Sequence, residues 1–277
     1  MTTTFEYTAD DIIQALQQMQ DERQRDALMR FFKTGAGDYG EGDRFLGLRC
    51  PQTRMVVREV RGRVALSEVE RLIASPWHEV RLCGFLLIVE EMRRVLPTAR
   101  RHTEAMAARR NELARFYLRH ARQANNWDLV DMTCPKILGY WLLYPQADGT
   151  MPDRGILDRL AESDNLWEQR IAMVTNWMLI RHGQFEDALR IADRLLAHPH
   201  DLIHKAVGWM LREVGKENMA VLEGYLERRY SQMARTTLRY AMKKSLNTAA
   251  AQTLMTMVGV GRSTDFLLRM GIDEDHI

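Results

Sequence analysis

A tryptophan and an aspartate lie four residues apart in the segment Asn126-Trp127-Asp128-Leu129-Val130-Asp131. The segment has helical periodicity, and residues at positions i and i+4 project from the same side of a helix. Trp127 and Asp131 therefore present an aromatic face and a carboxylate together, which suits a substrate that is planar and positively charged. Taken alone, a helical tryptophan is more often a core residue and an aspartate more often solvated or a partner of the helix dipole. Asp128 points away from this side, and we interpret it as structural.

The elements that must position this pair are helices. Apolar residues recur with helical spacing along most of the chain, whereas sustained period-two alternation and Asn-Gly hairpin turns are absent. We therefore predict an all-α fold. Helical stretches are expected at about 9–20, 22–33, 78–94, 99–122, 127–144, 153–162, 166–181, 184–197, 201–214, 217–229, 231–245 and 248–258. Pro51 is expected to open a further helix, and Ser67 and Glu70 have capping-box spacing for the next one.

The spacing of the helices favours stacked antiparallel pairs. Arg81 to Phe85 and Lys205 to Trp209 share a basic residue, a glycine and an aromatic residue in the same frame. This weak similarity and the absence of a long linker favour a HEAT-like α-solenoid with a concave face. We predict one domain over residues 1–277, with a glycine-rich loop at 34–49 between helices. The sequence leaves open whether the tail at 264–277 is ordered.

Basic residues are concentrated in two stretches. Arg100 to Arg122 contains seven arginines and two glutamates, and Ser231 to Ser245 contains four cations and no acid. In the second stretch, Arg235, Arg239 and Lys243 follow one another at four-residue intervals and form a stripe along a helix. These residues are candidate phosphate contacts, although charged residues also commonly occupy solvated helix faces.

Composition limits the class of protein. The chain has 277 residues, 46% of them hydrophobic and 27% charged, with a formal net charge of +2. These values describe a globular chain and give no global argument for a polyanionic partner. The three cysteines form no CxxC pair, and we expect free thiols in a reducing compartment. Neither a signal peptide nor a membrane span is evident, so a cytoplasmic location is expected.

Established cofactor and metal motifs are absent from the sequence. His198, His200 and His204 lie close together, but no HExxH motif or cysteine partner accompanies them. No phosphate-binding glycine loop follows a predicted strand, and no GxSxG motif occurs. We therefore expect neither a metal nor a cofactor.

Three segments in order resemble the AlkD-like family of DNA alkylation repair glycosylases. They are Asn125 to Asp131, Leu166 to Arg170, and Lys205 to Glu213; Met29 to Lys33 and Phe45 to Pro51 are also similar to that family. The resemblance extends over most of the chain. It implies a HEAT-like solenoid that holds duplex DNA in its concave groove and excises cationic N3- and N7-alkylated purines. It also implies that the modified nucleotide is not rotated into a deep pocket, unlike in the usual base-flipping glycosylases.

The resemblance also implies roles for individual residues. Asp131 would be the catalytic carboxylate, Trp127 and Trp209 the aromatic residues beside the lesion, and Arg170 a contact to the DNA backbone. Phe31 occupies a position where the family often has tyrosine, so it can stack but cannot donate a hydrogen bond.

The chemistry of such a set is self-consistent. An alkylated purine already carries a positive charge and leaves readily, so the main requirement is to stabilise the electron-poor sugar. A fixed carboxylate can do this and can orient a water molecule. The expected partner is double-stranded DNA that contains alkylated purines, bound by a monomer. Two alternatives stay open: a non-catalytic DNA-binding protein of the same fold, and a helical-repeat scaffold that binds proteins. The sequence does not rank 3-methyladenine, 7-methylguanine and bulkier lesions.

Overall fold

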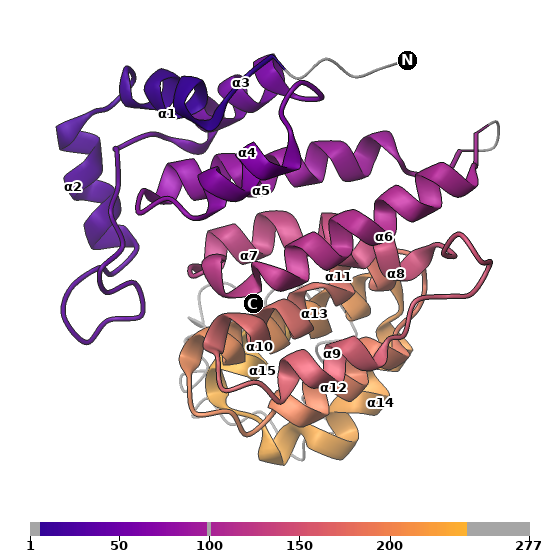
Figure 1. The fold of residues 1–277 in the computed structure, drawn as a ribbon. Helices are drawn as coiled ribbons and strands as arrows, with labels where there is room; N and C mark the ends of the chain where they lie inside the picture. The colour runs from indigo at the N-terminus through magenta and orange to yellow at the C-terminus, as the bar shows by residue number, and fades with distance from the viewer. Residues whose placement is uncertain (1–5, 99–100, 243–277) are drawn as a thin grey trace. The chain divides into compact units, whose positions relative to one another are not determined.

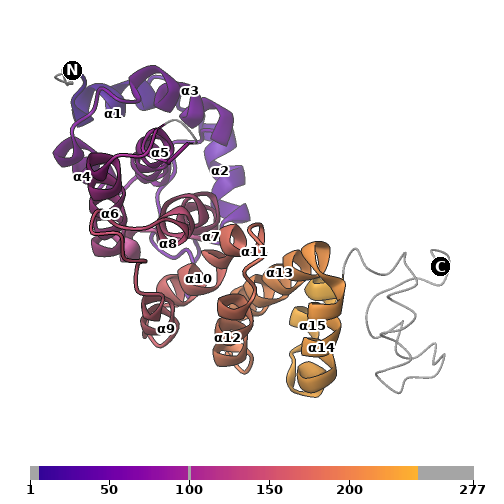
Figure 2. The ribbon, with the colours of Figure 1, turned by 90° about the vertical axis from the view of Figure 1, so that its right-hand side faces the viewer.

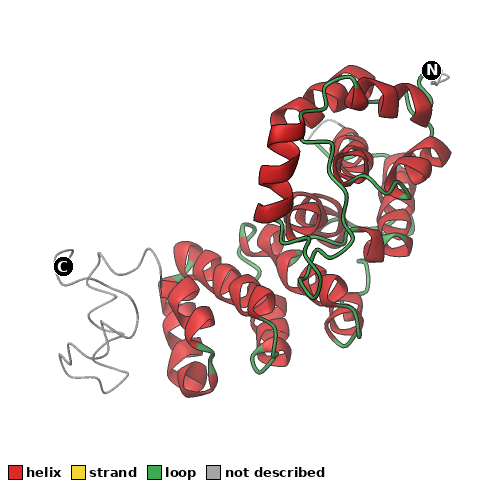
Figure 3. Ribbon diagram, turned by 90° about the vertical axis from the view of Figure 1, so that its left-hand side faces the viewer, coloured by secondary structure: helices red, strands yellow, loops and turns green. Residues whose placement is uncertain are grey.

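Helices form almost all of the regular structure. The computed structural model describes residues 6–98 and 101–242, and within these ranges it contains isolated bridges but no β-strand (Figure 3). The predicted all-α class is therefore confirmed. Lys243, the expected helix at 248–258 and the tail at 264–277 lie outside the described residues. No described helix is both long and apolar enough to cross a membrane.

The chain divides into two compact units, which comprise residues 1–153 and 154–277. The prediction of one continuous domain over 1–277 stays a prediction. The helices of the first unit are α1 (Ala9–Gln17), α2 (Glu22–Phe31), α3 (Cys50–Val60), α4 (Leu66–Ile73), α5 (His78–Arg94), α6 (Glu104–Arg119), α7 (Trp127–Cys134) and α8 (Tyr140–Leu143) (Figure 1).

Helix α5 is the centre of the first unit. Its apolar run from Leu82 to Val89 is buried, and α1, α3, α4, α6 and α7 all pack against it (Figure 2). Gly84 permits the close approach of α4, because a Cβ atom there would lie 2.9 Å from Cγ1 of Ile73. A helix covered on several sides explains why its sequence is apolar over more than one face.

Helix α7 is shorter than its apolar pattern suggests. The helix begins at Trp127 and ends at Cys134, and a π-helical turn, Pro135–Gly139, separates it from α8. Pro135 lacks the N–H group that a continuous α-helix would use, which favours an irregular turn here. The expected single helix at 127–144 is therefore two helices joined by this turn.

The second unit is built around α13. Its helices are α9 (Gly155–Ala161), α10 (Leu166–Val174), α11 (Asn176–Ile180), α12 (Glu186–Leu195), α13 (Asp201–Glu217), α14 (Met219–Arg229) and α15 (Arg235–Met242). Helix α13 packs against α10, α11, α12, α14 and α15. Gly208 lies at the crossing with α15, where a Cβ atom would be only 2.4 Å from the carbonyl oxygen of Thr237. Only glycine allows these two backbones to approach so closely.

Candidate active site

Helix α7 carries the predicted aromatic and acidic pair. Asn126 caps the helix, and its side-chain oxygen accepts a hydrogen bond of 2.9 Å from the backbone N–H of Trp127. The Asn126 side chain is fully buried and lies close to Gly40 of the loop before α3. Trp127 and Asp131 are both partly exposed and lie one turn apart on this anchored helix.

Trp127 is the outer member of a stack of aromatic rings. Phe32 lies 5.2 Å from Trp127 and 5.1 Å from Phe45, with interplanar angles of 23° and 20°. The ring of His78 stacks on Phe45 at 4.4 Å. Phe31 meets Trp127 edge-on at 5.8 Å, and its side chain is 63% exposed. The indole is therefore held by rings on its inner side and has an exposed aromatic neighbour, which preorganises it for stacking.

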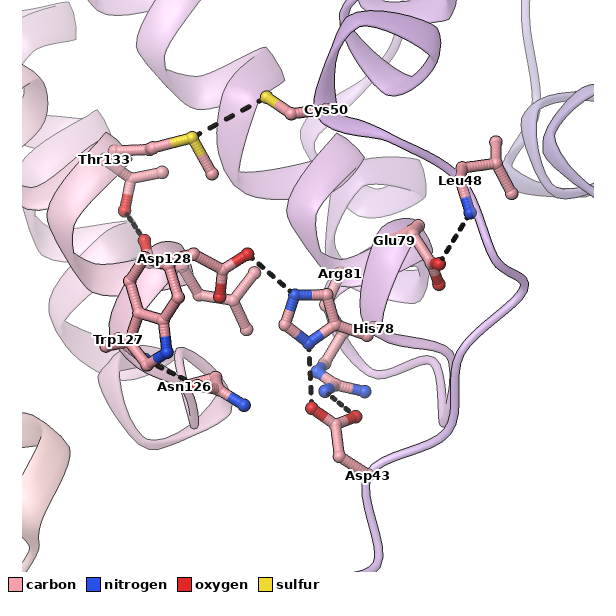
Figure 4. Close-up of polar contacts among 12 residues, drawn as sticks. Asp43, Leu48, Cys50, His78, Glu79, Arg81, Asn126, Trp127, Asp128 and Thr133 are labelled. Carbon is pink, nitrogen blue, oxygen red and sulfur yellow. Dashed lines mark hydrogen bonds and ion pairs between the residues drawn. The ribbon is translucent and has the colours of Figure 1, made fainter. Parts of the chain in front are cut away.

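His78 joins the loop to α7 through two buried carboxylates. Its Nδ1 lies 2.8 Å from Asp43 and its Nε2 lies 2.9 Å from Asp128 (Figure 4). Burial alone would lower the pKa of His78, but the charges and hydrogen bonds of Asp128 and Asp43 outweigh it and raise the pKa to about 9. His78 is thus a buried imidazolium that bridges two carboxylates, and Asp128 has a structural role.

Two neighbours of His78 complete the attachment of the loop. Arg81 donates to Asp43 at 2.5 Å and to the carbonyl of Ser75 at 3.0 Å. Burial opposes ionisation of Asp43, but the hydrogen bond and charge of His78, followed by Arg81, hold its pKa below the usual value. The Glu79 carboxylate accepts backbone hydrogen bonds from Leu46, Gly47 and Leu48 at 2.9–3.0 Å. The glycine-rich loop is therefore fixed to the first turn of α5, the same turn that holds α7.

The buried phenol of Tyr117 lies close enough to Asp131 for their charges to interact. Burial raises the pKa of Tyr117 well above its usual value, and the charges of Cys134 and Asp131 add to the effect. The Tyr117 hydroxyl lies 3.3 Å from the hydroxyl of Thr133, and this hydrogen bond opposes part of the rise in its pKa.

Two predicted site residues belong to the second unit. Arg170, on α10, is 5% exposed, and its Nη1 donates to the carbonyl of Leu202 at 2.5 Å. Trp209, on α13, is partly exposed, and its indole N–H donates to the buried carboxylate of Glu213 at 3.1 Å. Both side chains therefore have fixed orientations within this unit. Their predicted roles stay predictions.

Two of the predicted phosphate contacts lie on α15. Arg235 and Arg239 are exposed and lie one turn apart, as a stripe requires. Lys243, the third member, lies outside the described residues. Over residues 6–98 and 101–242 there is no group of three His, Cys, Asp or Glu side chains placed to hold a metal ion.

Comparison with known proteins identifies the family. A family model described as DNA alkylation repair enzyme matches residues 12–245, which is most of the chain. The chain belongs to this family. No curated protein sequence matches the chain.

A solved structure shows that the DNA alkylation repair fold is shared. The chain is similar to a protein described as a predicted DNA alkylation repair enzyme from Enterococcus faecalis, with a TM-score of 0.57 and 14% sequence identity. The alignment covers 88% of this chain and 100% of that one. The solenoid-like all-α fold is therefore confirmed. The predicted membership of an alkylation repair family is confirmed by the family model.

Sequence reasoning missed the polar residues that brace α7 in this DNA alkylation repair family member. His78, Asp43, Arg81 and Glu79 come together only in the folded chain, since His78 is 35 residues from Asp43 and 50 from Asp128. The available signal was modest: an aspartate within a glycine-rich loop and a His-Glu pair at the start of an apolar helix. These residues make the first turn of α7 a rigid platform for Trp127 and Asp131.

Proposed function

We propose that this member of the DNA alkylation repair family is a DNA glycosylase. It hydrolyses the N-glycosidic bond of cationic N3- and N7-alkylated purines in duplex DNA, as a monomer and without rotating the nucleotide into a deep pocket. The observation that supports this most directly is the braced N-terminus of α7. The helix presents the Trp127 ring and the Asp131 carboxylate one turn apart and is anchored by Asn126 and Asp128.

The carboxylate would act on the sugar rather than on the base. As the glycosidic bond breaks, its electron pair moves to the purine and neutralises the positive charge there, while positive charge develops on the sugar. Asp131 stabilises that charge and orients the water whose oxygen forms the new bond to the sugar carbon, and the proton that this water loses passes to the Asp131 carboxylate and then to solvent. Because the leaving group is already cationic, no general acid is required for its departure.

The aromatic residues would select the charged base. A cation over an indole face gains about 0.5–2 kcal/mol, depending on desolvation. Trp127 is already stacked on Phe32, so little freedom is lost when a substrate arrives. Phe31 adds a stacking surface beside it, and Trp209 is proposed as the second indole at the lesion.

The remaining cations are proposed to hold the DNA backbone. Arg235 and Arg239 are exposed on α15 and can reach phosphates, with Lys243 as the proposed continuation of the stripe. Arg170 is proposed to contact the backbone near the lesion. Its bond to Leu202 and its burial equally suit a structural role, which is the observation that favours a non-catalytic DNA-binding protein as the second candidate.

Substitution of Asp131 by asparagine separates these two functions. We expect Asp131→Asn to slow release of 7-methylguanine from duplex DNA by roughly two to three orders of magnitude, because a uniquely placed charge is removed. Affinity for undamaged duplex should be unchanged. The measurements are base release from methylated DNA under single-turnover conditions and a binding titration.

A matched control is Asp26→Asn, which removes an exposed carboxylate from α2 of the same unit. This control should release the base at the wild-type rate. Wild-type release by Asp131→Asn would exclude the assigned role of this carboxylate. Absence of release by the wild-type protein itself would favour the non-catalytic candidate.

A further inference from the structure

Arg54 of α3 rests on two sulfur atoms beside the candidate catalytic helix. Its Nε lies 3.2 Å from Sγ of Cys50, and its Nη2 lies 3.7 Å from Sδ of Met132. The two sulfurs are themselves 3.7 Å apart. Met132 directly follows Asp131 on α7, so this guanidinium contacts the helix that carries the proposed catalytic residue.

The partners of Arg54 leave its charge uncompensated. Thioether and thiol sulfurs are weak hydrogen-bond acceptors. Within residues 6–98 and 101–242, neither Arg54 nor Lys136 forms an ion pair with a carboxylate. Both side chains are partly exposed. A guanidinium held by weak acceptors keeps its capacity for a strong, charge-assisted partner.

Lys136 adds a second cation to the same place. It lies one turn beyond Met132, at the start of the π-helical turn. Burial lowers the pKa of Lys136, and the nearby charges of Arg54 and Arg93 lower it further. The neighbouring carboxylate of Glu90 is occupied by Arg93 at 2.7 Å and Arg61 at 3.7 Å. Cations from α3, α5 and the π-helical turn therefore outnumber the one carboxylate beside them, Glu90, whose charge opposes part of the fall in the pKa of Lys136. A further anion would be bound favourably here.

We propose that Arg54 and Lys136 form a phosphate-binding site that holds the DNA backbone beside Asp131. The inference rests on the proposed function and adds a backbone contact in the first unit to those predicted in the second. A bridging phosphate would accept hydrogen bonds from both cations and relieve their mutual repulsion.

The location of this site fits a substrate that also reaches Asp131. Lys136 follows Asp131 by five positions, which corresponds to roughly 7 Å along a helix at about 1.5 Å per residue. Two nucleotides of one DNA strand span a similar length, at about 3.4 Å each. Arg58, one turn beyond Arg54 on α3, is exposed and extends the basic surface.

Two single substitutions test the site. In the full-length protein, Arg54→Met and Lys136→Met should each weaken binding to a labelled duplex by on the order of tenfold, equally for damaged and undamaged DNA. Each should reduce the slope of the logarithm of affinity against the logarithm of salt concentration by roughly 0.9. Arg54→Lys and Lys136→Arg keep the charge and should retain the wild-type slope.

The matched control is Arg71→Ala on α4, which removes an exposed arginine already paired with Asp10 and Glu68. It should leave the affinity and the slope unchanged. The proposed site would be overturned if Arg54→Met and Lys136→Met unfolded at the wild-type temperature and bound DNA with the affinity and salt slope of this control. The readout is DNA binding, so it stays informative if the wild-type protein releases no base, an outcome that would contradict the glycosylase proposal alone.

Discussion

At the scale of single residues, the most consequential group is the buried imidazolium of His78. It lies between Asp43 and Asp128, and each carboxylate alone would be costly to bury as an anion. Together with Arg81 they form a compensated set of charges within the first unit. Because Asp128 sits in the first turn of α7, the compensation also fixes the helix that carries Trp127 and Asp131.

Replacement of His78 should destabilise the protein in a pH-dependent way. His78→Gln leaves two buried carboxylates with one fewer cation, so the free energy of unfolding should fall by roughly 3–5 kcal/mol at neutral pH. The folded-state pKa of His78 is raised from 6.5 to about 9. Its stabilising effect is therefore complete below about pH 6.5 and is lost as the pH rises through about 9.

Urea unfolding at a series of pH values measures this difference. The gap between the wild-type protein and His78→Gln should be largest at pH 6 and should shrink towards pH 9.5. His102→Gln, which changes an exposed histidine, should show no such gap. A gap that widened with rising pH would mean that His78 is neutral in the folded protein.

Sequence reasoning succeeded where the residues share one helical turn and failed where they do not. The relation of Trp127 to Asp131 follows from the geometry of one helix, so the sequence alone predicts that they share a side. The pairing of His78 with Asp43 and Asp128 depends on how a loop and two helices meet. No local pattern encodes such contacts, because the partners are distant in sequence and each is an ordinary polar residue when considered singly.

At the scale of elements, two glycines explain the weak internal similarity found in the sequence. Gly84 and Gly208 occupy the same frame relative to a basic residue and an aromatic residue, and both lie at close helix crossings. Gly84 admits α4 against α5, and Gly208 admits α15 against α13. The similarity therefore reflects a shared packing requirement. Whether it also marks HEAT repeats stays a prediction.

The loop between α2 and α3 should loosen when Glu79 is changed. Glu79→Gln replaces a carboxylate that accepts three backbone hydrogen bonds with an amide that has one acceptor oxygen. At least one buried N–H loses its partner, at a cost of roughly 1–3 kcal/mol. Hydrogen exchange at the amides of Leu46, Gly47 and Leu48 should accelerate by roughly tenfold or more.

Glu41→Gln is the control for this change, since Glu41 accepts a single exposed backbone hydrogen bond from Gly37. It should leave exchange at Leu46, Gly47 and Leu48 unaltered. Unchanged protection in Glu79→Gln would show that other contacts hold the loop, and that the carboxylate is not its anchor.

At the scale of the whole molecule, the proposed function draws on both compact units. Trp127, Asp131 and the Arg54–Lys136 site belong to the first unit, whereas Arg170, Trp209 and the α15 stripe belong to the second. The family match spans both units, from residue 12 to residue 245. Helical periodicity was sufficient to predict the class of fold. The division into units was not predicted, because it depends on which helices pack together and not on any linker visible in the sequence.

If one duplex is held by both units, their contributions to the salt dependence of binding should add. Each phosphate contact releases its own counterions, so the double variant Arg235→Ala/Arg239→Ala should reduce the salt slope by roughly 0.9 for each arginine. Adding Lys136→Met should lower the slope further, by about as much as the loss of one arginine.

Arg229→Ala, which removes an α14 arginine already paired with Asp193, is the matched control and should leave the slope unchanged. A salt slope for Arg235→Ala/Arg239→Ala equal to that of the control would remove α15 from the DNA interface. If Lys136→Met alone weakens binding, a triple variant no weaker than the double variant would show that the two units do not hold the same duplex.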